Sequence, residues 1–157
     1  MASNSQIKNE EILPKWGILG AGAMGWLWTY YLQRAKISTL LLQRQNTSYR
    51  ECIIQKDNIF ENCRTSAIKS DNPCLPALDA LIIATKAYSV RSALLPLQEV
   101  LSSKQIPIIL LQNGLGVFEE VRQLLPEQPI LILSTSNGAY WHESAFLKLT
   151  GVGSSYF

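Results

Sequence analysis

The sequence lacks the paired cysteines that disulfide frameworks and most zinc sites require. Its three cysteines, Cys52, Cys63 and Cys74, are an odd number and form no CxxC pair, which disfavours both kinds of site. We therefore expect no metal site. Reduced thiols are typical of cytoplasmic proteins, so we expect that location. The single histidine, His142, falls in a predicted strand and is interpreted as a surface or packing residue rather than a catalytic one.

The sequence also lacks a strong net charge and a long apolar run. The net charge is +2 and the basic residues are scattered singly, which does not indicate nucleic-acid binding. No apolar run is long enough to cross a bilayer, so no membrane partner is expected. The polar segment of residues 1–13 has no apolar core of the kind found in signal peptides. We expect residues 1–14 to form a disordered tail and residues 15–157 to form one globular domain.

A glycine-rich turn is the strongest motif in the chain. The apolar run Trp16–Leu19 leads into Gly-Ala-Gly-Ala-Met-Gly, and a helical pattern follows it. Strand, glycine turn and helix in this order are typical of the phosphate-binding turn of dinucleotide folds. Gly20 would allow the tight turn, Gly22 would let a pyrophosphate approach the backbone, and Gly25 would let the helix pack closely on the strand. The alternative is a turn with a packing role only.

The residue that follows the second predicted strand indicates which dinucleotide is bound. Strand Ser38–Gln43 ends at Arg44, and no acidic residue follows before Glu51. In dinucleotide folds this position meets the adenosine ribose, where an acid would select NAD. An arginine can instead bind a 2′-phosphate through two parallel hydrogen bonds, which favours NADP. The alternative is a solvated loop arginine.

Two further polar residues follow predicted strands. Lys86 comes directly after the apolar run 81–85, and Asn113 comes soon after the run 106–111. Ligands in open α/β sheets bind outside the carboxyl ends of the strands, so Lys86 can face cofactor oxygens and Asn113 can contact a nicotinamide ribose or a substrate carbonyl. The alternatives are a helix-entry lysine that points to water and an asparagine that caps a turn.

The whole pattern predicts an α/β fold of the Rossmann type, doubly wound, with a mostly parallel sheet, helices on both faces and an antiparallel closing edge. The first helix is apolar almost all round, so we expect it to be buried between layers or against a second domain. The expected elements are strands at 16–19, 38–43, 81–85, 106–111 and 130–133, helices at 23–34, 88–101 and 117–125, a hairpin of 52–55 with 64–68, a polar loop at 134–138, and a closing pair of 140–142 with 146–150.

Several phrases together resemble the N-terminal domain of ketopantoate reductase (2-dehydropantoate 2-reductase). They are the glycine turn, Arg44 after the second strand, Thr85-Lys86-Ala87, and the run from Gln112 to Glu120 that begins Gln-Asn-Gly-Leu-Gly. The resemblance covers about residues 15–157. The Lys-Ala and Asn-Gly-Leu-Gly phrases separate this family from other Rossmann dehydrogenases.

The resemblance implies an oxidoreductase that reduces ketopantoate, a small 2-keto acid, to pantoate with NADPH, on the route to pantothenate. It implies that Arg44 holds the 2′-phosphate, that Lys86 and Ala139 contact the cofactor, and that Asn113 contacts the cofactor and the substrate. It also implies that the glycine turn holds the pyrophosphate through Gly20, Ala21, Gly22, Ala23, Met24 and Gly25.

The sequence departs from the family pattern after this domain. Family members continue into a helical C-terminal domain that carries the proton-donating lysine, and we find no counterpart to it in residues 15–157. We therefore expect no catalytic residue in this chain and no activity of the chain alone. The alternatives are a non-catalytic NADP-binding module, a truncated gene product, or a related enzyme acting on another keto acid or a polyol phosphate. A face left open by that domain, including Trp26, Trp28 or Tyr156, is expected to drive self-association.

Overall fold

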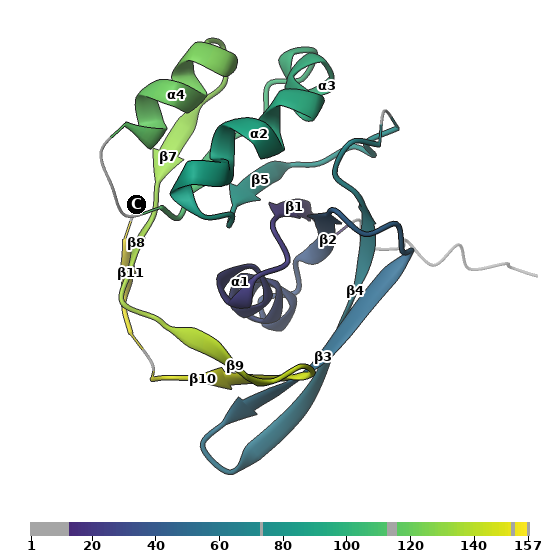
Figure 1. Ribbon diagram of the computed structural model, residues 1–157, viewed down its shortest axis with the longest axis vertical. Coiled ribbons are helices and arrows are strands. Elements are labelled where there is room, and N and C mark those ends of the chain that lie inside the picture. The colour runs from purple at the N-terminus through teal and green to yellow at the C-terminus, as the bar shows by residue number, and fades with distance from the viewer. Residues whose placement is uncertain (1–12, 73, 113–115, 152, 157) are drawn as a thin grey trace, which may run out of the picture.

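One large sheet organises the molecule. The computed structural model describes residues 13–72, 74–112, 116–151 and 153–156, and it contains a nine-stranded sheet (Figure 1). In pairing order the strands are β7 (Ile130–Ile132), β6 (Ile108–Leu110), β5 (Ala80–Ile83), β1 (Lys15–Leu19), β2 (Ser38–Gln43), β4 (Ile59–Lys69), β3 (Tyr49–Lys56), β10 (Phe146–Leu149) and β9 (Ala139–Glu143). All neighbours from β7 to β4 pair in parallel, whereas β3 pairs antiparallel with β4, and β9 antiparallel with β10. The predicted Rossmann-type fold with an antiparallel closing edge is confirmed.

The first helix is enclosed by the curled sheet. Helix α1 (Ala23–Arg34) lies against β1 and β2, and the strands β9 and β10 pass on its other side (Figure 1). Trp26 is completely buried and meets Trp141 of β9 edge to face, with 6.5 Å between the ring centroids. This enclosure explains why the helix has no polar face, and the prediction of burial between layers is confirmed.

The prediction of an open apolar face that includes Trp26, Trp28 or Tyr156 is therefore partly wrong. Trp26 cannot contribute to it, because it is fully buried, and Trp28 is only partly exposed. Tyr156 is 69% exposed. Self-association itself stays a prediction, which light scattering of the isolated chain would test.

The other face of the sheet carries the remaining helices. They are α2 (Val90–Leu94), α3 (Gln98–Ser102) and α4 (Val117–Leu124), with short 3-10 turns at Ala87–Ser89 and Leu95–Leu97. Leucines of these segments pack on Leu81 and Ile108 of the sheet. The single helix expected over 88–101 is interrupted where Pro96 lies, because proline has no N–H to continue the helical ladder and crowds the preceding turn.

The antiparallel part is more extensive than the sequence indicates. The hairpin of β3 and β4 turns at Asp57, whose φ is +53°, and places Cys52 opposite Cys63. β10 then joins β3 in parallel, which links the closing pair to this hairpin. The expected polar loop at 134–138 begins instead with β8 (Ser134–Thr135), which pairs with β11 (Ser155–Tyr156).

The structure also bears on the cysteines, on membrane-spanning helices and on the start of the chain. All three cysteines are free. None of the helices in the described ranges combines the length and apolar character needed to cross a membrane. Of the expected N-terminal tail only Leu13 and Pro14 are described, and the Pro14 carbonyl accepts a hydrogen bond from the Ser38 N–H at 2.8 Å.

Candidate functional site

The glycine turn between β1 and α1 needs glycine at two positions. Gly20 has φ of +116°, and a Cβ there would lie 3.0 Å from the backbone of Ala84 and Thr85. Gly25 is buried, and a Cβ there would overlap the carbonyl oxygen of Gly20. The first glycine therefore permits the turn, and the second permits α1 to begin directly against it.

Gly22 differs from both because the space around it is open. A Cβ at Gly22 would meet no heavy atom within 4 Å, and the backbone angles of φ −77° and ψ −178° suit any residue. Gly22 is the N-cap of α1 and provides no side-chain cap. The N–H groups of the first helical turn are thus left for another acceptor, and the helix dipole favours an anionic one.

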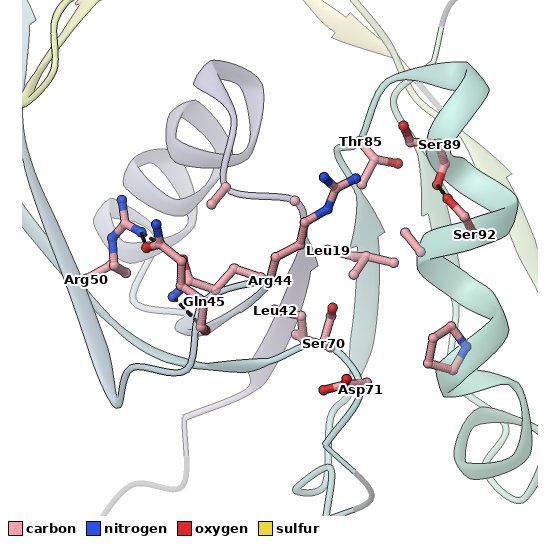
Figure 2. A pocket seen from close by; sticks show the side chains of 15 residues that line it. Leu19, Leu42, Arg44, Gln45, Arg50, Ser70, Asp71, Thr85, Ser89 and Ser92 are labelled. Atoms are coloured by element: carbon pink, nitrogen blue, oxygen red, sulfur yellow. Dashed lines mark hydrogen bonds between the residues drawn. The ribbon is translucent and has the colours of Figure 1, made fainter.

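A cavity of about 510 Å³ lies on one side of this turn. Its walls come from the turn, the ends of β2 and β4, and the helix α2, and they include Gly20, Ala21, Leu42, Arg44, Arg50, Ser70, Asp71, Thr85 and Ser92 (Figure 2). Arg44 is exposed and extends across the cavity toward Thr85 (Figure 2). The structure therefore places the predicted arginine where the carboxyl end of β2 meets an open cavity.

The only acidic side chain that lines this cavity among the described residues is already paired. Asp71 accepts a hydrogen bond of 2.8 Å from the Lys69 ammonium. This hydrogen bond lowers the pKa of Asp71, so the carboxylate keeps its charge, with a cation beside it, to a lower pH than an unpaired aspartate. Arg44 forms no ion pair or side-chain hydrogen bond with the residues that the structure describes, so its guanidinium can donate to a ligand.

A second cavity, of about 470 Å³, lies on the other side of the turn. It brings together five of the predicted residues from three segments of the chain, with Gln112 and Thr85 beside them: Gly22, Ala23, Met24, Lys86 and Ala139. Lys86 is exposed at its rim. The remaining predicted residue, Asn113, lies outside the described residues, so its role stays a prediction.

Gln112 joins the ends of two strands beneath this second cavity. Its Nε2 donates to the carbonyl oxygens of Ile83 at 2.9 Å and of Thr85 at 2.8 Å. Both acceptors are carbonyls, so the orientation of the amide is fixed. The side chain holds the segment after β6 against the end of β5. Sequence reasoning included Gln112 in a family phrase but could not find this role, because nothing local shows where the side chain points.

The two cavities suit one elongated ligand with an anionic middle. They share Thr85 and lie on either side of the glycine turn, along the carboxyl ends of the parallel strands. A dinucleotide has this shape, with two nucleosides joined by a pyrophosphate. No group of three potential metal-ligating side chains occurs within the described ranges, and His142 is exposed on β9.

The family model and the curated relatives agree on one family. The family model described as "Ketopantoate reductase PanE/ApbA" matches residues 16–157. The 2-dehydropantoate 2-reductase of Vibrio cholerae is 31% identical over 136 residues, which is 87% of this chain and 44% of the relative. The same enzyme of Listeria innocua is 33% identical over 130 residues, 78% of this chain and 42% of the relative. The chain thus spans less than half the length of these curated relatives.

Solved structures show the same fold. A probable 2-dehydropantoate 2-reductase from Bacillus subtilis superposes with a TM-score of 0.74 at 22% identity, covering 90% of this chain and 50% of that one. A D-mandelate dehydrogenase with NADH and anilino(oxo)acetate gives a TM-score of 0.77 at 22% identity, covering 90% and 47%. At this identity the likeness concerns the fold alone.

Proposed function

Because this chain belongs to the ketopantoate reductase (PanE/ApbA) family, we propose that it forms the cofactor-binding half of an NADPH-dependent 2-dehydropantoate 2-reductase. The reaction would reduce ketopantoate to pantoate for pantothenate synthesis. The observation that supports this most is the pair of cavities that meet at the glycine turn. We place the reaction in the cytoplasm, which three free cysteines support.

The residues of this chain would hold the cofactor in three parts. The first cavity would hold the adenosine, the N–H groups at the start of α1 would hold the pyrophosphate, and the second cavity would hold the nicotinamide riboside. The open space at Gly22 supports the pyrophosphate placement, since a backbone without Cβ allows close approach. A reduced nicotinamide bound there supplies a hydride for carbonyl reduction.

NADP is favoured over NAD by the charges at the end of β2. Arg44 is the side chain that follows the strand, and no acidic residue follows it before Glu51. The one acid among the described residues that line the cavity, Asp71, is paired with Lys69. A guanidinium matches a phosphate with two parallel hydrogen bonds. We therefore propose that Arg44 binds the 2′-phosphate.

Lys86 and Asn113 would act at the nicotinamide end. Lys86 is exposed and lines the second cavity, where its ammonium could donate to ribose or phosphate oxygens. We do not assign it the proton that the forming alkoxide takes up, because the family resemblance gives that role to a lysine of the helical domain. Asn113 is proposed to contact both the cofactor and the keto acid. Ala139 would line the cavity through its backbone and methyl group.

The activity is tested by supplying the rest of the enzyme. We expect the chain, mixed with the separately folded helical domain of a family relative, to oxidise NADPH when ketopantoate is added. Each component alone is the control, and pyruvate is the control for the substrate. NADPH binding without any ketopantoate-dependent turnover, with both components folded, would contradict the reductase proposal and leave a cofactor-binding module.

A further inference from the structure

The connection between β2 and β3 is organised by a buried amide. Gln43, the last residue of β2, is only 5% exposed. Its Nε2 donates to the Thr47 hydroxyl at 2.7 Å and to the Gln45 carbonyl at 3.3 Å. These bonds join Gln43, which precedes Arg44, to Gln45 and Thr47, which follow it, so they fix the backbone that carries the Arg44 side chain.

A second arginine completes this network from the neighbouring hairpin. The Nη1 group of Arg50, on β3, donates to Gln43 Oε1 at 3.1 Å and to Gln45 Oε1 at 2.5 Å. Arg50 is half-buried and lines the same cavity as Arg44. Its other guanidinium nitrogens make no hydrogen bond within the described part of the chain, so they can donate to a ligand.

The two guanidinium groups come from different directions. Figure 2 shows Arg44 reaching toward Thr85, and Arg50 on the other side of Gln45. Arg50 is held by two amide oxygens, whereas Arg44 makes no side-chain hydrogen bond to any residue that the structure describes. One cation is thus fixed in the wall of the cavity, and the other has no side-chain hydrogen bond in the described part of the chain that fixes its direction.

We propose that Arg50 is the second cation of the 2′-phosphate subsite, with Arg44 as the first. This inference rests on the proposed use of NADP. A phosphate monoester carries a charge of about −1.5 to −2 at pH 7, so one guanidinium neutralises only part of it. The acid in the same cavity, Asp71, is paired with Lys69, so it does not compete for Arg50. Arg50 therefore determines cofactor specificity together with Arg44.

The probe that isolates this subsite is adenosine 2′-monophosphate, with adenosine 5′-monophosphate as the comparison. We expect Arg50→Ala to weaken binding of the 2′-isomer and of NADPH at least about tenfold, the loss expected for a charge-assisted hydrogen bond. NADH and the 5′-isomer should stay within about twofold, because they have no 2′-phosphate. Arg64→Ala is the matched control, since Arg64 stacks on Tyr49 at 4.0 Å and does not line the cavity.

A conservative variant separates a direct role from mere support of the loop. Arg50→Lys keeps the positive charge but replaces the planar guanidinium, whose Nη1 donates to both Gln43 and Gln45, by a compact ammonium on a different stem. A direct electrostatic role predicts that Arg50→Lys retains most of the preference for the 2′-isomer and that this preference falls with added salt. Equal losses in the lysine and alanine variants, both folded by circular dichroism, would overturn the proposal.

The preference for NADPH over NADH distinguishes an error in the Arg50 assignment from an error in the proposed use of NADP. If the unaltered chain prefers NADPH to NADH and Arg50→Ala keeps that preference, the Arg50 assignment is wrong and the NADP proposal stands. If the unaltered chain shows no preference, the proposal of NADP itself is wrong and the Arg50 assignment falls with it.

Discussion

Gly22→Ala is expected to fold like the unaltered protein and to lose most of its NADPH binding. The space around Gly22 is open and its backbone angles suit alanine, so the fold tolerates the methyl group. The same methyl group would occupy the position where the pyrophosphate approaches the backbone. Loss of two charge-assisted hydrogen bonds corresponds to about a hundredfold weaker binding, or about 2.8 kcal/mol. Titration with NADPH measures the loss, and urea unfolding measures the stability.

Gly25→Ala is the matched variant, with the opposite expectation. A Cβ at Gly25 would overlap the Gly20 carbonyl oxygen, and Ile18 lies behind it at 3.5 Å. Backbone cannot move aside as a flexible side chain does, so we expect the free energy of unfolding to fall by about 3 kcal/mol or more. If Gly25→Ala were as stable as the unaltered protein, or if Gly22→Ala bound NADPH normally, this account of the turn would be contradicted.

Arg44→Ala is the second substitution with a large expected effect. The Arg44 side chain projects into the first cavity from the end of β2. We expect NADPH binding to weaken about tenfold to a hundredfold, because a bidentate charge-assisted contact is lost. NADH binding should not change, because the cofactor without the 2′-phosphate makes no such contact. The ratio of the two dissociation constants is the quantity to measure.

The control for Arg44→Ala is again Arg64→Ala, which removes the same charge away from the cavity. Equal weakening of NADPH and NADH by Arg44→Ala would indicate a general effect on the site and would contradict a role in selecting the 2′-phosphate. Arg44→Ala and Arg50→Ala combined test whether the two arginines act on one phosphate, because coupled residues give non-additive losses.

The central sheet and its first helix could be predicted because their signals are local. Strand Ser38–Gln43 and helix Ala23–Arg34 have the predicted bounds. The pairing of β10 with β3 could not be predicted, because it joins segments far apart in the sequence and no local pattern specifies a partner. The enclosure of Trp26 follows from that pairing, which is why part of the helix surface expected to be open is buried.

The site shows the same division between local and distant signals. The glycine turn, Arg44 and Lys86 are each marked by their position after an apolar strand, and the structure places them along two adjacent cavities. The places of Arg50 and Asp71 and the role of Gln112 could not be predicted, because their side chains reach the site only through the hairpin and the strand ends.

The most direct test of this account is a pair of titrations of the unaltered chain, one with NADPH and one with NADH. We expect saturable binding of both, with NADPH at least about tenfold tighter, the contribution expected of one charge-assisted contact to the 2′-phosphate. Binding of neither cofactor by a folded sample, or tighter binding of NADH, would contradict the claim that these cavities form an NADP site.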